Sequence, residues 1–417
     1  MANIRVSIIT IGDELLIGQT IDTNSAWMAQ RLNELGVDVV RRVAVGDVAV
    51  EITTALDEEL TKAEVVLITG GLGPTADDIT KPLLCKYFGG KMVVDERTLE
   101  HIKTIFTKRN RPFLEANMKQ AEVPDCCTVL HNRIGTAPGM LFHKAGKIII
   151  SMPGVPFEMM AIMEDEVLPY LQQNFSHDAI VHKSIITSGE GESFIAEKIK
   201  DLETALPAHI KLAYLPSPGI VKLRLTGRGN DKLSLESELK LRQEEFANRL
   251  ENIVVSLHDL PLAQVLGQSL IEKKATIGLA ESCTGGYISH ELTQIVGATQ
   301  YFKGGIVCYD REVKENILGV DAKTIDTHTA VSEEIAIEMV QGALKVLKVD
   351  YALSITGMLG PATDKDEPPP GTVWMAVADK SSVKTRKFKF HYDRLRNKDM
   401  AMQSAIVFMW RFINNKL

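Results

Sequence analysis

The sequence has few cysteines, few aromatic residues and no excess of positive charge, and these shortages exclude several classes of protein. Five cysteines are an odd number, and they lack the spacing of metal ligands, so we expect reduced thiols and not a disulfide framework. A net charge of −7 gives no general attraction to nucleic acid or to an anionic membrane. No apolar run is long enough to span a membrane, and the first residues lack a signal-peptide core. We therefore expect a cytoplasmic protein without membrane or direct nucleic-acid contacts.

The length of 417 residues is too great for one ordinary hydrophobic core. Short apolar runs alternate with amphipathic stretches up to about residue 170, and the same alternation resumes after about residue 260. Such alternation is typical of parallel sheets covered by helices. We predict an α/β protein in which two parallel-sheet α/β domains are joined by a small α+β domain. The predicted boundaries are 1–170, 178–255 and 257–417.

One turn combines chemical groups that can perform catalysis. An apolar, strand-like run at 276–280 leads directly into Glu281-Ser282-Cys283-Thr284-Gly285-Gly286. A helix predicted over about 285–295 would point its free N–H groups at this turn, where Ser282 is a candidate nucleophile and the helix a source of oxyanion donors. The alternative is that Ser282 or Thr284 only caps the helix.

Two further strand ends carry polar groups that suit the same site. Tyr309 and Lys314 follow one apolar strand, and the loop from Thr356 through Gly357 to Gly360 follows another. Because loops at the carboxyl ends of parallel strands gather where ligands bind, these residues form a plausible pocket with the Ser282 turn. A buried, neutral lysine can act as a base. The alternatives are a solvated helical lysine and glycines that only form turns.

These residues, in this order over about 150 positions, resemble the PncC-type nicotinamide-nucleotide amidase domain. The resemblance implies hydrolysis of nicotinamide mononucleotide to nicotinate mononucleotide and ammonia without a cofactor. It implies that Ser282 is the nucleophile and Lys314 its base, supported by Tyr309 and Thr356. The acidic insert at 362–367 departs from the expected glycine-rich loop, and Arg394 and Arg396 are candidates for a phosphate contact or a solvated face. Carried over as substrate-binding residues are Glu281, Cys283, Thr284, Gly285, Gly286, Gly357, Gly360 and Arg394.

A glycine-rich loop in the first half is a candidate phosphate site. The strand-like run 65–69 opens into this loop, and Gly70, Gly71, Gly73 and Thr75 are the predicted phosphate-binding residues. Read loosely, the loop also matches a dinucleotide fingerprint, with Asp95 about twenty residues further on. Two acidic residues that follow the loop oppose that reading, because they would repel a pyrophosphate unless a cation lies between them.

Carboxylates at neighbouring strand ends predict a site for Mg²⁺ or a similar divalent cation. The alternative for Asp13 and Asp47 is that they cap helices. The predicted metal ligands are Asp13, Glu14, Asp47, Asp77 and Asp78.

The first half resembles the MoaB/MogA-like molybdopterin-binding fold and, more closely, the amino-terminal domain of the CinA family. With the amidase-like half, the whole chain resembles a full-length CinA protein. The family resemblance implies metal-dependent cleavage of ADP-ribose by the first half. The middle segment resembles a KH module, but Gly189-Glu190-Gly191-Glu192 lacks the spacing of a GXXG clamp, so we interpret it as a spacer. A homodimer is expected; the alternatives are a non-catalytic pterin- or nucleotide-binding module and a competence-associated adapter.

Overall fold

The computed structural model of the protein describes residues 4–75, 78–175, 178–361 and 368–417. These residues form two compact units, of which the first runs up to Val181 and includes Arg228–Glu236, and the second comprises His182–Gly227 and Ser237–Leu417. Each unit is described by itself below. Asp77 and the acidic insert at 362–367 lie outside the described residues. Among the described residues, no helix combines the length and the apolar character needed to cross a membrane.

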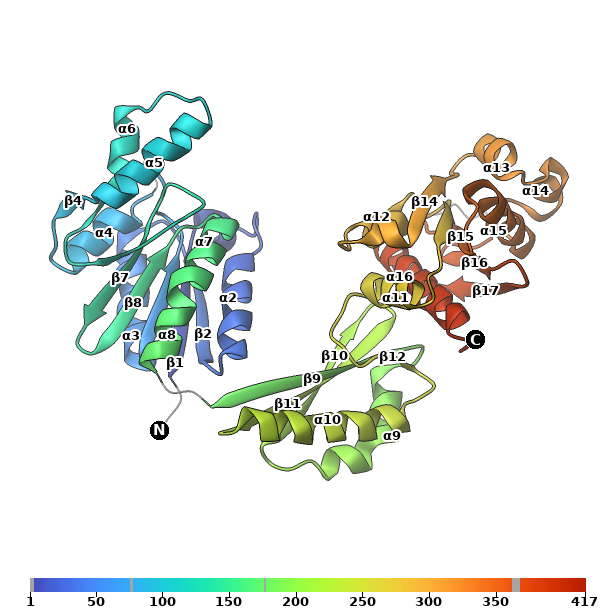
Figure 1. Cartoon of the computed structure of the whole chain (residues 1–417), viewed down its shortest axis with the longest axis horizontal. Coiled ribbons are helices and arrows are strands. Elements are labelled where there is room, and N and C mark those ends of the chain that lie inside the picture. The colour runs from blue at the N-terminus through green and yellow to red at the C-terminus, as the bar shows by residue number, and fades with distance from the viewer. Residues whose placement is uncertain (1–3, 76–77, 176–177, 362–367) are drawn as a thin grey trace. The chain divides into compact units, whose positions relative to one another are not determined.

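The first unit is built around a six-stranded sheet with the order β2-β1-β3-β8-β7-β6 (Figure 1). The first four strands are parallel, whereas β7 and β6 add antiparallel pairs at one edge. Every residue of β3 is buried, as expected for a strand inside a sheet that helices cover on both faces. The strands are β1 (Arg5–Ile11), β2 (Asp38–Val45), β3 (Val65–Thr69), β6 (Thr128–Leu130), β7 (Gly139–Lys144) and β8 (Lys147–Met152); β4 (Met92–Val94) and β5 (Glu122–Pro124) form a separate pair.

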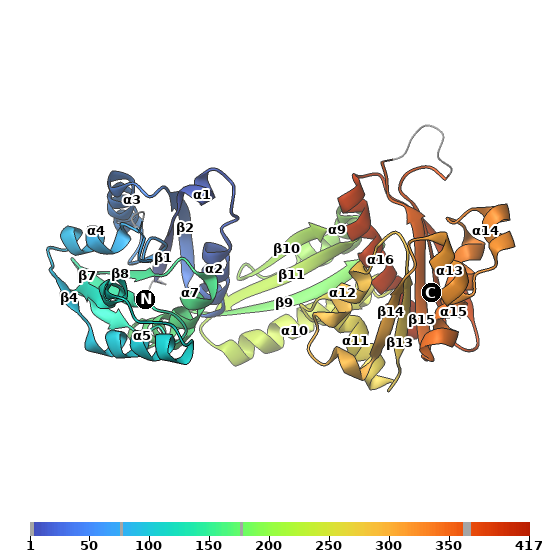
Figure 2. The same ribbon diagram turned by 90° about the horizontal axis from the view of Figure 1, so that it is seen from above.

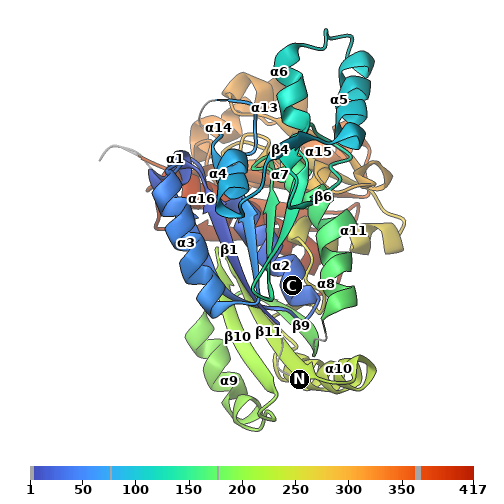
Figure 3. The same cartoon turned by 90° about the vertical axis from the view of Figure 1, so that its left-hand side faces the viewer.

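Helices cover both faces of this sheet, and each face has its own hydrophobic core. Side chains of α2, α7 and α8 pack on one face, and side chains of α3 and α4 pack on the other (Figure 3). The helices are α1 (Asp13–Leu16), α2 (Thr23–Glu34), α3 (Ala49–Lys62), α4 (Thr80–Tyr87), α5 (Glu96–Lys108), α6 (Glu115–Met118), α7 (Pro156–Ile162) and α8 (Leu168–Asn174), with a 3-10 turn at Lys119–Ala121 and a π-helical turn at Met163–Val167.

The middle segment forms a four-stranded sheet with the order β10-β11-β9-β12. Figure 1 shows α9 and α10 along one side of these strands. Strand β10 continues through Ser217, which pairs with Ile220, so a two-residue turn at Pro218 and Gly219 connects β10 to β11. The elements are β9 (Ala179–Ser188), α9 (Glu192–Thr204), β10 (Ile210–Ser217), β11 (Ile220–Gly229), α10 (Lys232–Arg249) and β12 (Val254–Ser256).

The carboxy-terminal part of the second unit has a five-stranded sheet with the order β14-β13-β15-β16-β17. The first three strands are parallel and the last two are antiparallel. Helices α11, α12 and α16 pack on one face, and α13, α14 and α15 on the other (Figure 2). The elements are α11 (Leu262–Glu272), β13 (Ile277–Glu281), α12 (Tyr287–Thr293), a 3-10 turn (Ala298–Gln300), β14 (Phe302–Val307), α13 (Arg311–Leu318), α14 (Ala322–His328), α15 (Glu333–Leu347), β15 (Tyr351–Met358), β16 (Thr372–Ala378), β17 (Val383–Lys389) and α16 (Arg394–Ile413).

The predicted α/β class is confirmed, and both large sheets have parallel centres. The sheets are only partly parallel, because each ends in a pair of antiparallel strands joined by a short connection. The predicted domain boundaries stay predictions.

Candidate active site

The carboxyl ends of the parallel strands β13, β14 and β15 bring the predicted amidase residues to one edge of the sheet. The Ser282 N–H donates to the carbonyl of Ile355 over 3.0 Å, and the Cys308 N–H donates to the carbonyl of Glu281 over 2.8 Å. The end of β13 is therefore held by both neighbouring strands. In open α/β sheets, this edge is where ligands bind.

Lys314 and Ser282 lie within hydrogen-bonding distance, although 32 residues separate them in the chain. The Lys314 side chain is 1% exposed, and its Nζ lies 3.3 Å from Ser282 Oγ. The same nitrogen donates to the backbone carbonyls of Cys308, over 2.6 Å, and Tyr309, over 3.0 Å. Burial lowers the pKa of Lys314. The lysine is thus an inward-facing residue of α13 and not a solvated one.

Two thiols flank this pair, and neither is poised as a nucleophile. Burial raises the pKa of the Cys283 thiol to about 12 and that of Cys308 to about 11. A thiol is a strong nucleophile only as the thiolate. Ser282, between Glu281 and Cys283, is therefore the better candidate nucleophile of the turn.

Glu281 holds the first turn of α12 and is itself fully buried. Its Oε2 accepts hydrogen bonds from Thr284 Oγ1, over 2.8 Å, and from the Ile288 N–H, over 3.0 Å. Its Oε1 accepts from the Ser289 N–H, over 2.8 Å, and from Ser289 Oγ, over 2.6 Å. With both oxygens occupied inside the protein, Glu281 positions the turn, and no oxygen is left for the predicted substrate contact.

This arrangement corrects two sequence expectations for the turn. The helix begins at Tyr287, and no side chain of Ser282 or Thr284 caps it. The Ile288 and Ser289 N–H groups, which we expected to face Ser282, are bound by Glu281. The turn reverses through Gly285 (φ 60°) and Gly286 (φ 89°), both in the left-handed region that favours glycine.

Tyr309 and Arg394 lie together at the rim of the site. Arg394 donates through Nη1 to the carbonyl of Gly360, over 2.7 Å, and through Nη2 to Tyr309 Oη, over 3.3 Å. Tyr309 is 64% exposed, so its ring is accessible to a ligand. Tyr309, Gly360 and Arg394, which come from three different parts of the fold, therefore meet at the rim of the site.

Thr356 and Gly357 make contacts that hold the surrounding fold together. Thr356 is 1% exposed and its Oγ1 donates to the carbonyl of Ala330 over 2.7 Å, which fixes the loop ahead of α15. A methyl group built on Gly357 would lie 2.7 Å from Val373 Cγ2. Neither residue makes a hydrogen bond to Ser282 among the contacts of the described residues.

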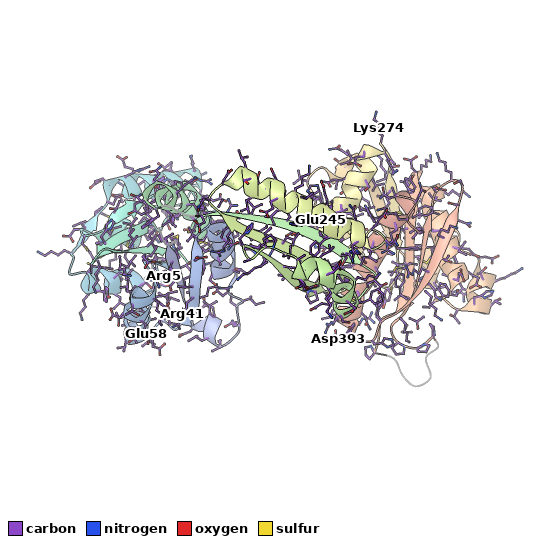
Figure 4. All side chains as sticks on the ribbon, turned by 90° about the horizontal axis from the view of Figure 1, so that it is seen from below. Arg5, Arg41, Glu58, Glu245, Lys274 and Asp393 are labelled. Atoms are coloured by element: carbon purple, nitrogen blue, oxygen red, sulfur yellow. The ribbon has the colours of Figure 1, made fainter. Side chains whose placement is uncertain are left out.

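The two arginines at the start of α16 point to different partners. Asp393, labelled in Figure 4, caps this helix by accepting from the Leu395 and Arg396 N–H groups. The guanidinium of Arg396 lies 4.2 Å above the ring of Tyr392, whereas Arg394 reaches Gly360 and Tyr309. Only Arg394 joins the predicted site residues.

In the first unit, Asp78 occupies the donors that we expected a phosphate to use. Its carboxylate accepts from the Gly73 N–H over 2.8 Å and from the Thr75 N–H over 2.9 Å. The Gly70 N–H donates to the carbonyl of Met152, and the φ of Gly71 is 65°. The loop is thus closed on itself, and a phosphate would have to displace Asp78.

The other predicted metal ligands form a pair and not a cluster. Asp13 Oδ1 accepts from the Asp47 N–H, and Asp47 Oδ2 accepts from the Asp13 N–H, each over 3.1 Å. Among the described residues, which do not include Asp77, no three acidic, histidine or cysteine side chains come close enough to hold a metal ion. The predicted metal site stays a prediction.

A small cavity of about 130 Å³ lies at the carboxyl ends of β1 and β3. Its walls include Glu14, which we predicted as a metal ligand, and Asn24, whose Nδ2 donates to the carbonyl of Gly154 over 2.7 Å. The Asn24 Oδ1 is buried and has no partner among the described residues. The cavity walls combine hydroxyl, amide and carboxylate side chains with apolar ones such as Ile11 and Leu15, and the volume of the cavity suits a small group better than a large ring.

The fold and the polar strand ends define a multi-domain α/β protein with one candidate site in each unit. Three protein families match along the chain: "Probable molybdopterin binding domain" at residues 7–173, "Damage-inducible protein CinA KH domain" at 182–255 and "CinA C-terminal domain" at 259–413. The chain belongs to the CinA family.

Two relatives that match over nearly the full length of both chains support this assignment. A CinA-like protein of Flavobacterium psychrophilum is 42% identical over 411 residues, which are 98% of each chain. A putative competence-damage inducible protein of Caldicellulosiruptor bescii is 40% identical and covers 96% of this chain and 97% of its own. The solved CinA structure from Thermoplasma acidophilum is 35% identical, covers 40% of this chain and 98% of its own, and has a TM-score of 0.37.

Sequence reasoning missed two residues beside the amidase site. Ser289 binds Glu281 twice, and Lys398 lies near Gly285. Lys398 follows Arg394 by four residues, and this helical spacing was the available signal. Ser289 gave no signal in the sequence, because its partner is eight residues away across a turn.

Proposed function

We propose that the carboxy-terminal half hydrolyses the carboxamide of nicotinamide mononucleotide to nicotinate mononucleotide and ammonia. The observation that carries this proposal is the contact between Lys314 Nζ and Ser282 Oγ, 3.3 Å apart. An amide is a poor electrophile, so its hydrolysis needs an activated nucleophile and a donor for the leaving nitrogen. A serine paired with a lysine provides both.

The surroundings of Lys314 suit a neutral amine. A neutral amine has two N–H groups and one lone pair, and the two carbonyls of Cys308 and Tyr309 accept the two N–H groups. The lone pair is then available for the Ser282 proton. Burial lowers the pKa of Lys314, which increases the neutral fraction.

The proposed reaction proceeds through an ester on Ser282. Ser282 Oγ attacks the carboxamide carbon and its proton passes to Lys314 Nζ. The tetrahedral intermediate collapses, the C–N bond breaks, and Lys314 returns the proton to the leaving nitrogen, which departs as ammonia. Water then attacks the ester carbon and gives a proton to Lys314 Nζ. Lys314 passes this proton to Ser282 Oγ as the ester C–O bond breaks, which restores the serine hydroxyl and the neutral amine, and the carboxylic acid product loses its own proton to the solvent.

Oxyanion donors come from the turn and not from α12 in this proposal. The Thr284 and Gly286 N–H groups donate no hydrogen bond within the described part of the chain, whereas those of Ile288 and Ser289 are taken by Glu281. Backbone donors held in place by a fixed turn stabilise developing negative charge without reorganisation. We propose the Thr284 and Gly286 N–H groups for this role.

The test measures ammonia release from nicotinamide mononucleotide, with and without a chelator. We expect release in both conditions, and we expect Ser282→Ala to reduce the rate at least about a hundredfold. Ser381→Ala is the matched control, because Ser381 is exposed and bonds only Asp379. Equal rates for Ser282→Ala and Ser381→Ala would refute the nucleophile.

A second proposed activity, in the first unit, is metal-dependent cleavage of the pyrophosphate of ADP-ribose. It is supported by the cavity at the strand ends, which has Glu14 in its wall, and by the Asp13–Asp47 pair, whose Asp13 precedes Glu14 in the chain. Mg²⁺ is commonly held by one or two carboxylates together with substrate phosphates, so a pair suffices when a substrate binds. The metal supplies charge neutralisation on the phosphates when bound. Asp13 and Asp47 would hold it, with Glu14 beside them in the cavity wall.

This second activity is tested by looking for AMP and ribose phosphate from ADP-ribose with Mg²⁺, Mn²⁺ or Co²⁺. We expect products with at least one metal and their loss in Asp47→Asn. Glu58→Gln is the control, because Glu58, labelled in Figure 4, is exposed and pairs only with Lys62. Binding of ADP-ribose without products would favour the alternative of a non-catalytic nucleotide- or pterin-binding module.

A further inference from the structure

Two cations on one face of α16 flank the Ser282 turn. Arg394 and Lys398 are four residues apart in this helix, a spacing that places side chains on the same face. Arg394 reaches Tyr309 and Gly360 at the rim of the site. Lys398 reaches the turn itself, where a methyl group built on Gly285 would lie 3.9 Å from its Nζ. The absence of a side chain on Gly285 leaves this space open.

The ammonium of Lys398 has no anionic partner in the described part of the chain. It is partly buried and lies 5.4 Å from the ring centroid of Tyr287, whose hydroxyl bonds the neighbouring Asp399. Gly285 belongs to the same turn as Ser282, because its N–H donates to the Ser282 carbonyl over 3.1 Å. A positive charge without an anionic partner among the described residues therefore lies beside the turn that carries the proposed nucleophile.

The positively charged residues at the start of α16 do not stabilise this helix. Arg394, Arg396 and Lys398 all lie in the first five residues of α16, where the helix dipole disfavours positive charge. Asp393 is used as the cap, and the first turn of the helix itself contains no acidic residue. Arg396 stacks on Tyr392, which leaves Arg394 and Lys398 facing the site. An anion bound between them would offset this unfavourable placement.

We propose that Lys398, together with Arg394, binds the phosphate of the substrate and makes the site selective for a nucleotide over the corresponding nucleoside. This inference rests on the proposed amidase function. A phosphate monoester carries close to two negative charges at neutral pH. An arginine fork and a lysine point charge are complementary ways of binding it. Lys398 is thus a specificity-determining residue that the reacting atoms do not need.

The experiment compares ammonia release from nicotinamide mononucleotide and from nicotinamide riboside, which lacks the phosphate. We expect Lys398→Met to raise KM for the nucleotide roughly tenfold or more, since hydrogen bonds between charged groups are among the stronger ones. We expect kcat for the nucleotide and kcat/KM for the riboside to change by less than about threefold. Arg396→Met removes the same charge from the same helix turn and should leave all values unchanged.

Binding provides a readout that does not depend on turnover. Equilibrium dialysis of both compounds against Ser282→Ala, alone and combined with Lys398→Met, should show weaker binding of the nucleotide only. Equal effects on nucleotide and riboside, or no effect of Lys398→Met on the nucleotide, would overturn the phosphate contact. Selective binding without ammonia release by the unsubstituted protein would instead overturn the amidase proposal and leave the phosphate contact standing.

Discussion

Replacing Glu281 tests whether a buried carboxylate holds the proposed nucleophile turn. Glu281→Gln keeps the shape of the side chain but turns one oxygen into an N–H₂ donor. Whichever way the amide lies, that donor faces one backbone N–H, of Ile288 or of Ser289, and one hydroxyl. The hydroxyl can rotate and accept, but the backbone N–H cannot. One buried donor is therefore left without a partner, at a cost of about 1–3 kcal/mol.

Glu281→Ala should cost more, because both backbone N–H groups lose their acceptor. We expect about 2–6 kcal/mol from the two unpaired groups, before the cavity left by the side chain is counted. Amide hydrogen exchange of peptides covering α12 measures the opening free energy directly. The rate of ammonia release from nicotinamide mononucleotide should decrease more in Glu281→Ala than in Glu281→Gln, and the decrease should appear in kcat.

The control is Glu272→Gln at the exposed end of α11, where no hydrogen bond is lost. It should leave exchange and activity within error of the unsubstituted protein. If Glu281→Gln and Glu281→Ala both leave the exchange of α12 unchanged within about 0.5 kcal/mol, the carboxylate does not anchor the helix, and the positioning role assigned to it is wrong.

Three further predictions concern the same half of the chain. Burial lowers the pKa of Lys314, and the neutral amine is the proposed base. The value of kcat/KM for ammonia release should therefore rise with pH and level off below about 10.4, the ordinary pKa of lysine. A rise centred at or above that pKa would contradict the buried base. Iodoacetamide at pH 8 should modify the exposed Cys126 and spare Cys283, because burial raises the pKa of the Cys283 thiol to about 12. Ammonia release should be unchanged after this treatment. Inactivation through modification of Cys283 would point to a thiol nucleophile. Gly357→Ala should destabilise the domain by about 1–3 kcal/mol in urea unfolding, since its methyl group meets Val373. Gly229→Ala, with open space around it and no positive φ, should not destabilise the protein.

Much of the fold could be predicted from the sequence, because local patterns determine it. The all-apolar run of β3 and the run that becomes β13 indicated buried strands, and the glycines and polar residues that follow them indicated loops. The antiparallel ends of the two sheets could not be predicted in this way. Strand direction depends on the length and path of the connections, which periodicity does not report.

The candidate site was predictable in its residue types but not in its hydrogen bonds. The sequence placed Ser282 and Lys314 at neighbouring strand ends, yet only the structure shows that two backbone carbonyls bind the lysine. The family resemblance led us to expect that Glu281 binds substrate. Nothing in the sequence shows that Ser289 and Ile288 use both of its carboxylate oxygens. Contacts between a strand end and the following helix depend on the turn geometry, and here two glycines with positive φ set that geometry.

Replacing Lys314 by methionine tests the central claim most directly, because methionine fills similar volume and cannot accept a proton. The rate of ammonia release from nicotinamide mononucleotide by Lys314→Met should fall at least about a hundredfold, while amide exchange of the β13 and β15 strands stays protected. A rate within about threefold of the unsubstituted protein would contradict the assignment of Lys314 as the base of Ser282.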